Sequence, residues 1–231
     1  MQPRSRMLER VEIFRDLPQA ERDRLAMRFR WTRYSAGEQI VGHLDRSTDV
    51  FLVLQGEVRV VIYSLAGREV TFRDIKAGHY FGELAAIDGL PRSASILALS
   101  DSVIASMSAD MFWEVLRAYP ETAAQLLKDL AGSVRALTER VFEFSALAVN
   151  NRIHAELLRL ARDHMTAENI AVIQPAPTHA EIASRISTHR EAVTRELGRL
   201  SRAGIVARRS GALVVEDVER LKRLVQDVIG Y

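Results

Sequence analysis

Three side chains that are close in the sequence could bind a phosphorylated sugar. Glu83 follows a glycine, and Arg92 and Ser93 come after a short apolar stretch. A guanidinium and a hydroxyl suit phosphate oxygens. A carboxylate disfavours a phosphate, so Glu83 is better explained as the acceptor of a nearby hydroxyl, as an acidic residue is on a ribose 2′-OH. Together these side chains indicate a ligand that carries both ribose and phosphate.

The residues between these side chains could form the backbone of such a site. Gly82 and Glu83 open a short apolar turn over 84–87, and the sequence Asp-Gly-Leu-Pro then ends it and returns the chain to Arg92. The first backbone N–H groups of a helical turn lack partners within the turn and can bind an anion. The alternative is a surface turn in which Glu83 and Arg92 pair with each other.

The whole stretch, with Gly-Glu-Leu at its start and Arg-Ser-Ala at its end, resembles the phosphate-binding cassette of cyclic-nucleotide-binding domains. The resemblance implies that Glu83 holds the ribose 2′-OH and that Arg92 and Ser93 hold the phosphate. It also implies that the backbone of Gly82, Leu84 and Ala94 lines the cradle.

The composition excludes several classes of protein. A chain of 231 residues can hold two modest domains. The absence of cysteine excludes disulfides, thiolate metal sites and cysteine-held iron–sulfur clusters. No apolar run approaches the roughly 18 residues of a membrane span, and Met-Gln-Pro-Arg-Ser-Arg is not followed by the apolar core of a signal peptide. We therefore expect a cytoplasmic protein with neither a membrane nor a metal partner.

Positive charge is concentrated in the C-terminal third. Residues 1–150 carry 19 basic and 20 acidic side chains, whereas residues 151–231 carry 13 and 10. Between Arg185 and Arg209 there are seven arginines against two glutamates. This bias is typical of a partner with a phosphate backbone, and the alternative is an ordinary solvated face.

The N-terminal half has the pattern of an antiparallel β domain. A helix is predicted from Leu17 to about Met27. Short β-rich runs separated by glycine-containing turns follow, which favours a barrel or sandwich of the jelly-roll kind with residues 82–94 as its one helix-like interruption. The predicted strands are Val50–Leu54, Val58–Tyr63, Glu69–Ile75, Ser95–Leu99 and Ser102–Met107.

The longest helical signal follows Pro120 and has a heptad pattern. Its apolar positions are spaced alternately by three and four residues, and valine at a with leucine at d favours a parallel two-stranded coiled coil. An ordinary amphipathic helix is the alternative. Thr138 lies beside this seam, and Asn150–Asn151 is the predicted hinge after it. The seam positions are Leu127, Leu130, Val134, Leu137, Val141, Phe144 and Ala148.

The C-terminal region has the spacing of a helix-turn-helix. Thr178 and Glu181 predict a capping box, with a helix to about Arg185 and a second helix from about His189 to Arg202. Residues 206–215 read as a β-hairpin that would add a wing, and a last helix is predicted over 218–228.

The cassette, the long helix and the string Thr-His-Arg-Glu-Ala-Val-Thr-Arg-Glu-Leu together resemble the Crp/Fnr family of bacterial transcription regulators. The resemblance implies that Arg190, Glu191 and Arg195 read bases in the major groove. Glu191 could instead cap its helix by pairing with Thr188. The full set of expected DNA contacts is Thr188, His189, Arg190, Glu191, Thr194, Arg195, Arg199 and Arg202.

The sequence departs from the pattern of the cAMP receptor proteins at two positions. His189 replaces a small hydroxyl residue before the recognition helix. On the long helix Leu137 replaces one of two adjacent hydroxyl residues that face adenine, so Thr138 alone remains. We therefore expect cAMP to be the effector, with cGMP as a second candidate ligand.

These observations predict an α+β protein in three parts. Residues 1–120 form a cyclic-nucleotide-binding β domain, residues 121–150 a dimerisation helix with its hinge, and residues 151–231 a winged helix-turn-helix. The expected function is a cAMP-dependent regulator that binds palindromic TGTGA-like DNA as a homodimer and acts on RNA polymerase. One alternative keeps the DNA module but gives the barrel a different ligand, such as a metabolite or a haem held near His79. An enzyme is disfavoured because no nucleophile, base and orienting partner cluster around the cassette.

Overall fold

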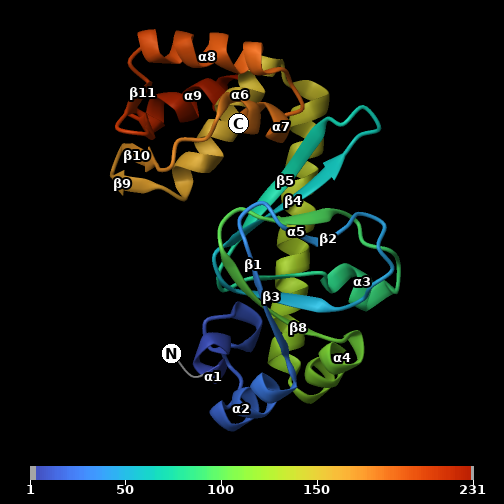
Figure 1. Cartoon of the computed structure of the whole chain (residues 1–231). Coiled ribbons are helices and arrows are strands. Elements are labelled where there is room, and N and C mark those ends of the chain that lie inside the picture. The colour runs from blue at the N-terminus through green and yellow to red at the C-terminus, as the bar shows by residue number, and fades with distance from the viewer. Residues whose placement is uncertain (1–3, 230–231) are drawn as a thin grey trace. The chain divides into compact units, whose positions relative to one another are not determined.

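The computed structural model of the chain describes residues 4–229 (Figure 1). Contacts divide it into two compact units, and the division falls within the long helix α5 (Pro120–Ala146). Among the described residues, the first unit comprises 4–64 together with 71–135, and the second comprises 65–70 and 136–229. The architecture confirms the predicted α+β class with a β domain, a long helix and a helix-turn-helix region.

Two four-stranded antiparallel sheets build the β domain. One sheet has the strand order β1-β8-β3-β6 and the other has the order β2-β7-β4-β5. The strands are β1 (Arg30–Tyr34), β2 (Gln39–Val41), β3 (Val50–Gln55), β4 (Glu57–Tyr63), β5 (Glu69–Lys76), β6 (Tyr80–Phe81), β7 (Ser95–Ala98) and β8 (Ser102–Met107). Five of them confirm the predicted strands to within two residues at each end, and β1, β2 and β6 were not predicted.

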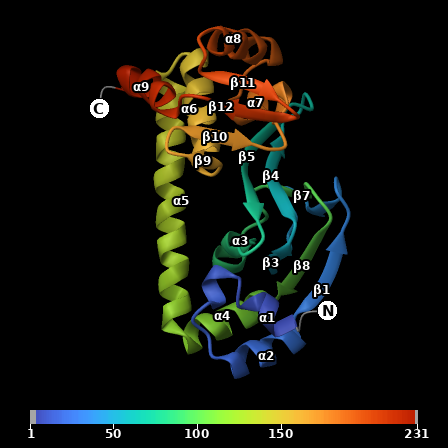
Figure 2. The same cartoon turned by 90° about the vertical axis from the view of Figure 1, so that its left-hand side faces the viewer.

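Helices gather at one end of the β domain. The helices α1 (Arg4–Leu8), α2 (Gln19–Arg28) and α4 (Ala109–Ala118) lie together there in both views (Figures 1 and 2). They contribute Leu8, Leu25 and Phe112 to a core that also contains Leu52 of β3. A second core lies between the sheets, where the rings of Phe51 and Phe81 stack with centroids 5.0 Å apart. The short helix α3 (Glu83–Asp88) confirms the helix-like interruption.

The second unit is a winged helix-turn-helix. Its sheet has the order β11-β12-β10-β9, and the wing strands pair antiparallel from Val206↔Val215 to Arg209↔Ala212. Ser210 and Gly211 both have positive φ, as a tight hairpin turn requires. The elements are α6 (Val149–Arg162), β9 (Met165–Ala167), β10 (Ile170–Ile173), α7 (His179–Arg185), α8 (Arg190–Arg202), β11 (Val206–Arg209), β12 (Ala212–Val215) and α9 (Val218–Ile229).

The predicted hinge at Asn150–Asn151 is wrong by a few residues. The helix α5 ends at Ala146, and Ala148 has the extended conformation (φ −63°, ψ 157°) of an N-cap. The backbone N–H of Asn151 donates to the Ala148 carbonyl at 3.0 Å, so both asparagines lie inside the first turn of α6. Asparagine favours turns over helix interiors, but its cost is small near a helix end, and tertiary context places both residues in the helix.

Candidate functional site

Two glycines in the left-handed conformation bound the helix of the cassette. Gly82 (φ 86°) precedes α3 and Gly89 (φ 71°) follows it. A Cβ on Gly82 would lie 2.7 Å from Nη1 of Arg92 and 2.8 Å from the Asp49 carbonyl oxygen. Such distances are closer than real Cβ contacts, so the fold requires glycine before Glu83.

Arg92 is buried, with 3% of its surface exposed, and its guanidinium is held in a fixed orientation. Nη1 donates to the Gly82 carbonyl at 3.0 Å, Nη2 to the Asp49 carbonyl at 2.7 Å, and Nε to Oγ of Ser47 at 3.1 Å. The group also lies over the Phe51 ring, 5.4 Å from its centroid. Among the described residues these bonds use three of the five N–H donors, so two remain for a phosphate oxygen.

Glu83 is the first residue of α3 and is 8% exposed. Burial raises the pKa of its carboxyl, and the charges of Arg73 and Arg92 oppose that shift only in part. No ion pair joins Glu83 to Arg92 within residues 4–229, which removes the simple surface-turn alternative. A buried carboxylate of this kind gains from a hydroxyl that donates to it.

Two further contacts fix the cassette to neighbouring helices of the first unit. Nε1 of Trp113 in α4 donates to the Ala86 carbonyl of α3 at 3.0 Å. The Tyr80 hydroxyl donates to Oδ2 of Asp129 in α5 at 2.7 Å. Burial, followed by this hydrogen bond, raises the pKa of Tyr80 far above its ordinary range. The cassette is therefore anchored to α4 and to the first half of α5.

The remaining cassette residues are more open. Leu84 and Ser93 are exposed and Ala94 is half-buried. The structure thus brings Gly82, Glu83 and Arg92 together, with Ser93 beside them in the chain. Thr138 belongs to the second unit and its side chain is exposed, so its juxtaposition with the cassette stays a prediction.

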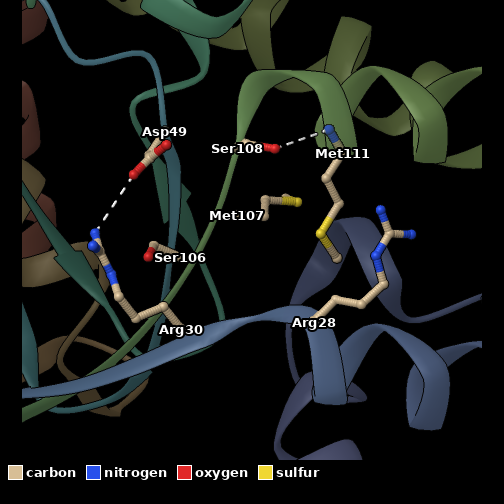
Figure 3. A pocket seen from close by; sticks show the side chains of 7 residues that line it. All are labelled: Arg28, Arg30, Asp49, Ser106, Met107, Ser108 and Met111. Atoms are coloured by element: carbon tan, nitrogen blue, oxygen red, sulfur yellow. Dashed lines mark hydrogen bonds and ion pairs between the residues drawn. The ribbon is translucent and has the colours of Figure 1, made fainter.

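A separate hollow in the first unit is lined by Arg28, Arg30, Asp49, Ser106, Met107, Ser108 and Met111. Figure 3 shows Arg30 directed toward Asp49, whose carboxylate lies 3.5 Å from the guanidinium. Arg28 is engaged by both oxygens of Glu114 at 2.9 and 2.7 Å, and Ser108 accepts from the Met111 N–H. Because these polar groups already have partners, this hollow is not our candidate for the nucleotide site.

The helix α8 presents a polar face on the second unit. Its apolar stripe, Val193, Leu197 and Leu200, is buried. On the opposite face a shallow hollow is lined by Arg190, Glu191, Thr194 and Arg195, and all four are exposed. Arg202 is exposed at the end of the helix. This arrangement agrees with the face expected to enter a groove of DNA.

The N-termini of the two helices differ in their capping. Thr178 and Glu181 form the predicted capping box at α7. The cap of α8 is His189, which makes no side-chain cap bond, so the alternative capping box of Thr188 and Glu191 is wrong. The reason is the register, since Glu191 lies only two residues after the actual N-cap. His179, which the sequence did not indicate, bonds the Thr194 hydroxyl at 2.7 Å.

Arg199 lies in a partly buried cluster rather than standing alone. Its Nε and Nη2 donate to the Glu196 carboxylate at distances from 2.6 to 3.1 Å. Oε1 of Glu196 lies 2.5 Å from Nε2 of His154 in α6. Burial lowers the pKa of His154, although the bond to Glu196 opposes the shift. Burial would raise the pKa of Glu196, but the bonds from Arg199 and His154 outweigh it and keep the carboxyl ionised.

Two absences apply to the part of the chain that the structure describes. No group of three or more His, Asp or Glu side chains could hold a metal ion. None of the described helices combines the length and the apolar character needed to cross a membrane.

Comparisons with known proteins match two separate segments of the chain. Residues 31–119 match the family model of the cyclic nucleotide-binding domain, and residues 151–224 match that of the Crp-like helix-turn-helix domain. The cyclic AMP receptor protein of Thermus thermophilus is 28% identical over 92% of this chain and 95% of its own length. The Pseudomonas aeruginosa protein named cAMP-activated global transcriptional regulator Vfr is 27% identical over 84% and 92%.

A solved structure supports the same fold. A CooA variant from Carboxydothermus hydrogenoformans superposes with a TM-score of 0.76 at 23% identity, covering 86% of this chain and 88% of that one. The two family models follow one another along the chain and account for both the cassette and the α7–α8 pair. The chain therefore belongs to the Crp/Fnr family of transcription regulators, with a cyclic-nucleotide-binding domain followed by a helix-turn-helix DNA-binding domain.

Proposed function

We propose that this regulator is activated by cAMP and binds a palindromic, TGTGA-like DNA site as a homodimer. The observation that carries the proposal is the cassette, in which buried Glu83 and buried Arg92 stand close together without pairing with each other. Glu83 would accept from the ribose 2′-OH, while Arg92 and Ser93 would bind the cyclic phosphate. The backbone of Gly82, Leu84 and Ala94 would line the site.

Selectivity for adenine would depend on the long helix. Thr138 is the one hydroxyl residue at the positions that face the base in related receptors, and we expect it to favour cAMP over cGMP in activation. A ligand shifts a conformational equilibrium only through its different affinities for the two states, so cGMP can occupy the site without activating. The names of two relatives, a cyclic AMP receptor protein and a cAMP-activated regulator, support cAMP as the effector.

The output would come from α8 and its flanking residues. Arg190 and Arg195 suit O6 and N7 of guanine and Glu191 suits N4 of cytosine. The other contacts, Thr188, His189, Thr194, Arg199 and Arg202, would position the helix on the phosphates or at the edge of the groove. The exposed heptad seam of α5 would form the dimer, so that cAMP aligns two recognition helices and the bound dimer recruits or blocks RNA polymerase in the cytoplasm.

Within this proposal the chain has three working parts. Residues 1–120 sense the nucleotide, residues 121–150 dimerise and transmit the signal, and residues 151–231 read the DNA. The boundaries of the two matched family models, at 31–119 and 151–224, support this division.

Calorimetric titration of cAMP and cGMP into the purified protein tests the proposal. We expect saturable cAMP binding that Arg92→Ala abolishes and that Arg92→Lys weakens, because lysine keeps the charge but loses the fork of donors. Arg33→Ala, at an exposed position of β1, is the matched control. Unchanged cAMP affinity in a folded Arg92→Ala protein would overturn the cassette assignment.

A further inference from the structure

Three residues from two helices of the second unit form a continuous polar chain that ends on the surface. His154 lies in α6, and Glu196 and Arg199 lie one turn apart in α8. His154 is 2% exposed and Glu196 is 8% exposed, whereas about half of the Arg199 side chain is open to solvent. The three side chains thus connect the core of the second unit with a half-exposed arginine of the recognition helix.

The distances define how protons are placed along this chain. Oε1 of Glu196 is 2.5 Å from Nε2 of His154, and a carboxylate can only accept. Nε2 of the imidazole therefore carries the proton and donates it. The second ring nitrogen, Nδ1, is buried without a hydrogen-bond partner among the described residues, which agrees with a neutral ring whose lone pair is left unused.

A buried polar group without a full set of partners costs free energy, so its retention needs a reason. Apolar side chains of similar volume at positions 154 and 196 would extend the core of α6 and α8 that already contains Ile153 and Val193. Apolar side chains at these positions could not accept hydrogen bonds from Arg199. Glu196 binds Nε and Nη2 of Arg199, which leaves Nη1 for another acceptor.

We propose that His154 and Glu196 are positioning residues that fix Arg199 for a contact with a DNA phosphate. His154 orients the Glu196 carboxylate, and Glu196 in turn fixes Nε and Nη2 of the guanidinium, whose Nη2 also lies 3.3 Å from Nε2 of His154. Nη1 is then the donor that would contact the phosphate. A pre-oriented arginine loses less side-chain entropy when it binds a phosphate than a free one would. The inference rests on the proposed role of α8 in DNA binding and adds two buried residues to that role.

The test measures binding of the full-length, cAMP-loaded protein to a fluorescent duplex at several salt concentrations. We expect Glu196→Gln and Arg199→Ala each to weaken binding by roughly three- to tenfold at moderate salt and to reduce the salt slope by about one per recognition helix. In the Arg199→Ala protein, adding Glu196→Gln should cause no further loss of DNA affinity. His154→Leu should act in the same way, and His154→Gln should retain binding because its amide can still donate to Glu196.

Several outcomes would overturn the inference. His154→Leu and Glu196→Gln proteins that melt earlier but keep the wild-type affinity and salt slope would show a purely structural role. If Glu196→Gln lowers the DNA affinity equally in the wild-type and Arg199→Ala proteins, then His154 and Glu196 do not act through Arg199. If His154→Leu fails to fold, the near-isosteric Glu196→Gln decides the question alone.

A second duplex distinguishes a failure of the proposed DNA site from a failure of this inference. Because a phosphate contact does not depend on sequence, the same variants are measured on an unrelated duplex. If the wild-type protein binds both duplexes equally well, the proposed TGTGA-like site is contradicted. If Glu196→Gln still weakens binding to both duplexes, the inference stands.

Discussion

Glu83 and Arg92 carry opposite charges, yet no ion pair joins them among residues 4–229. Arg92 donates to two carbonyls and to Ser47, while Glu83 is buried at the start of α3. In the proposed function the two side chains serve as separate recognition points, Arg92 for the phosphate and Glu83 for the ribose hydroxyl. The two predictions at the scale of single residues both concern the carboxyl of Glu83.

The first concerns the ribose hydroxyl. Glu83→Ala should weaken cAMP by roughly tenfold or more, since a hydrogen bond to a charged group contributes about 1.5–3 kcal/mol. A 2′-deoxy analogue should bind the wild-type protein poorly and should lose little more in the variant. Calorimetry with both ligands on both proteins measures the coupling between the 2′-OH and the Glu83 carboxylate. Equal penalties from Glu83→Ala for the two ligands would refute the assigned role.

The second concerns pH. Burial raises the pKa of Glu83 above its ordinary value of 4.5, so the folded protein binds a proton there more tightly than the unfolded chain does. Stability from this group is full below the ordinary pKa and is lost as pH rises through the raised one. At neutral pH, Glu83→Gln should therefore raise the melting temperature of the ligand-free protein.

The same substitution should weaken cAMP binding, because a neutral amide is a poorer acceptor for the 2′-OH. In the wild-type protein the affinity should fall as the solution is acidified through the raised pKa, since the carboxylate is the form that accepts. Glu83→Gln should remove this part of the pH dependence. A wild-type affinity that increases on acidification would contradict the assignment.

The cassette was predictable at this scale because its residues are consecutive, whereas its supports were not. Ser47 and the Asp49 carbonyl reach Arg92 only because the strands around them fold together. His154 and Glu196 are 42 residues apart and meet where α6 packs on α8. A single sequence carries no local signal for such partners.

At the scale of elements, the sequence predicts those helices and strands whose signals lie in their own residues, and it misses those that form only by pairing with distant strands. The wing and the capping box of α7 were predicted because their turn and cap residues are local. The strand β1, Arg-Trp-Thr-Arg-Tyr, is partly exposed and has two arginines, so it lacks a hydrophobic run. β2 has only three residues. Both are strands because they pair with β8 and β7.

At this scale we predict that two arginines of the recognition helix α8 contribute differently to DNA binding. Arg195 lines the exposed hollow of α8 and Arg202 is exposed at its end. Arg195→Ala should reduce discrimination at one base pair by roughly 1–3 kcal/mol, whereas Arg202→Ala should weaken all sequences alike and flatten the salt dependence. Binding to a set of single-base variants of the site, at two salt concentrations, separates the two effects. A sequence-independent loss from Arg195→Ala would show that this residue contacts phosphate only.

At the scale of the whole molecule, we expect the heptad seam of α5 to determine how two copies associate. Leu127, Val134 and Val141 are 66%, 63% and 65% exposed in a single chain, which is unusual for apolar side chains at regular spacing. Leu130, in contrast, packs against the core of its own β domain. We therefore expect the a positions to pack against a partner helix.

A charge in this seam should separate the dimer. Val141→Glu should shift the sedimentation profile toward the monomer and abolish tight DNA binding, because two buried like charges would face each other in a parallel pair. Ala136→Glu introduces the same charge at an exposed position outside the seam and is the control. A Val141→Glu protein that remains fully dimeric would place the interface elsewhere.

The central claim is that cAMP at the cassette aligns two recognition helices on one face of DNA. The most direct measurement is a fluorescence anisotropy titration of the wild-type protein, with and without cAMP, on a palindrome whose TGTGA-like half-sites lie one turn, about 34 Å or roughly 10 base pairs, apart. The account predicts high affinity only with cAMP, and loss of that affinity when about half a turn, roughly five base pairs, is inserted between the half-sites. Tight binding without cAMP, or equally tight binding to a lone half-site, would contradict it.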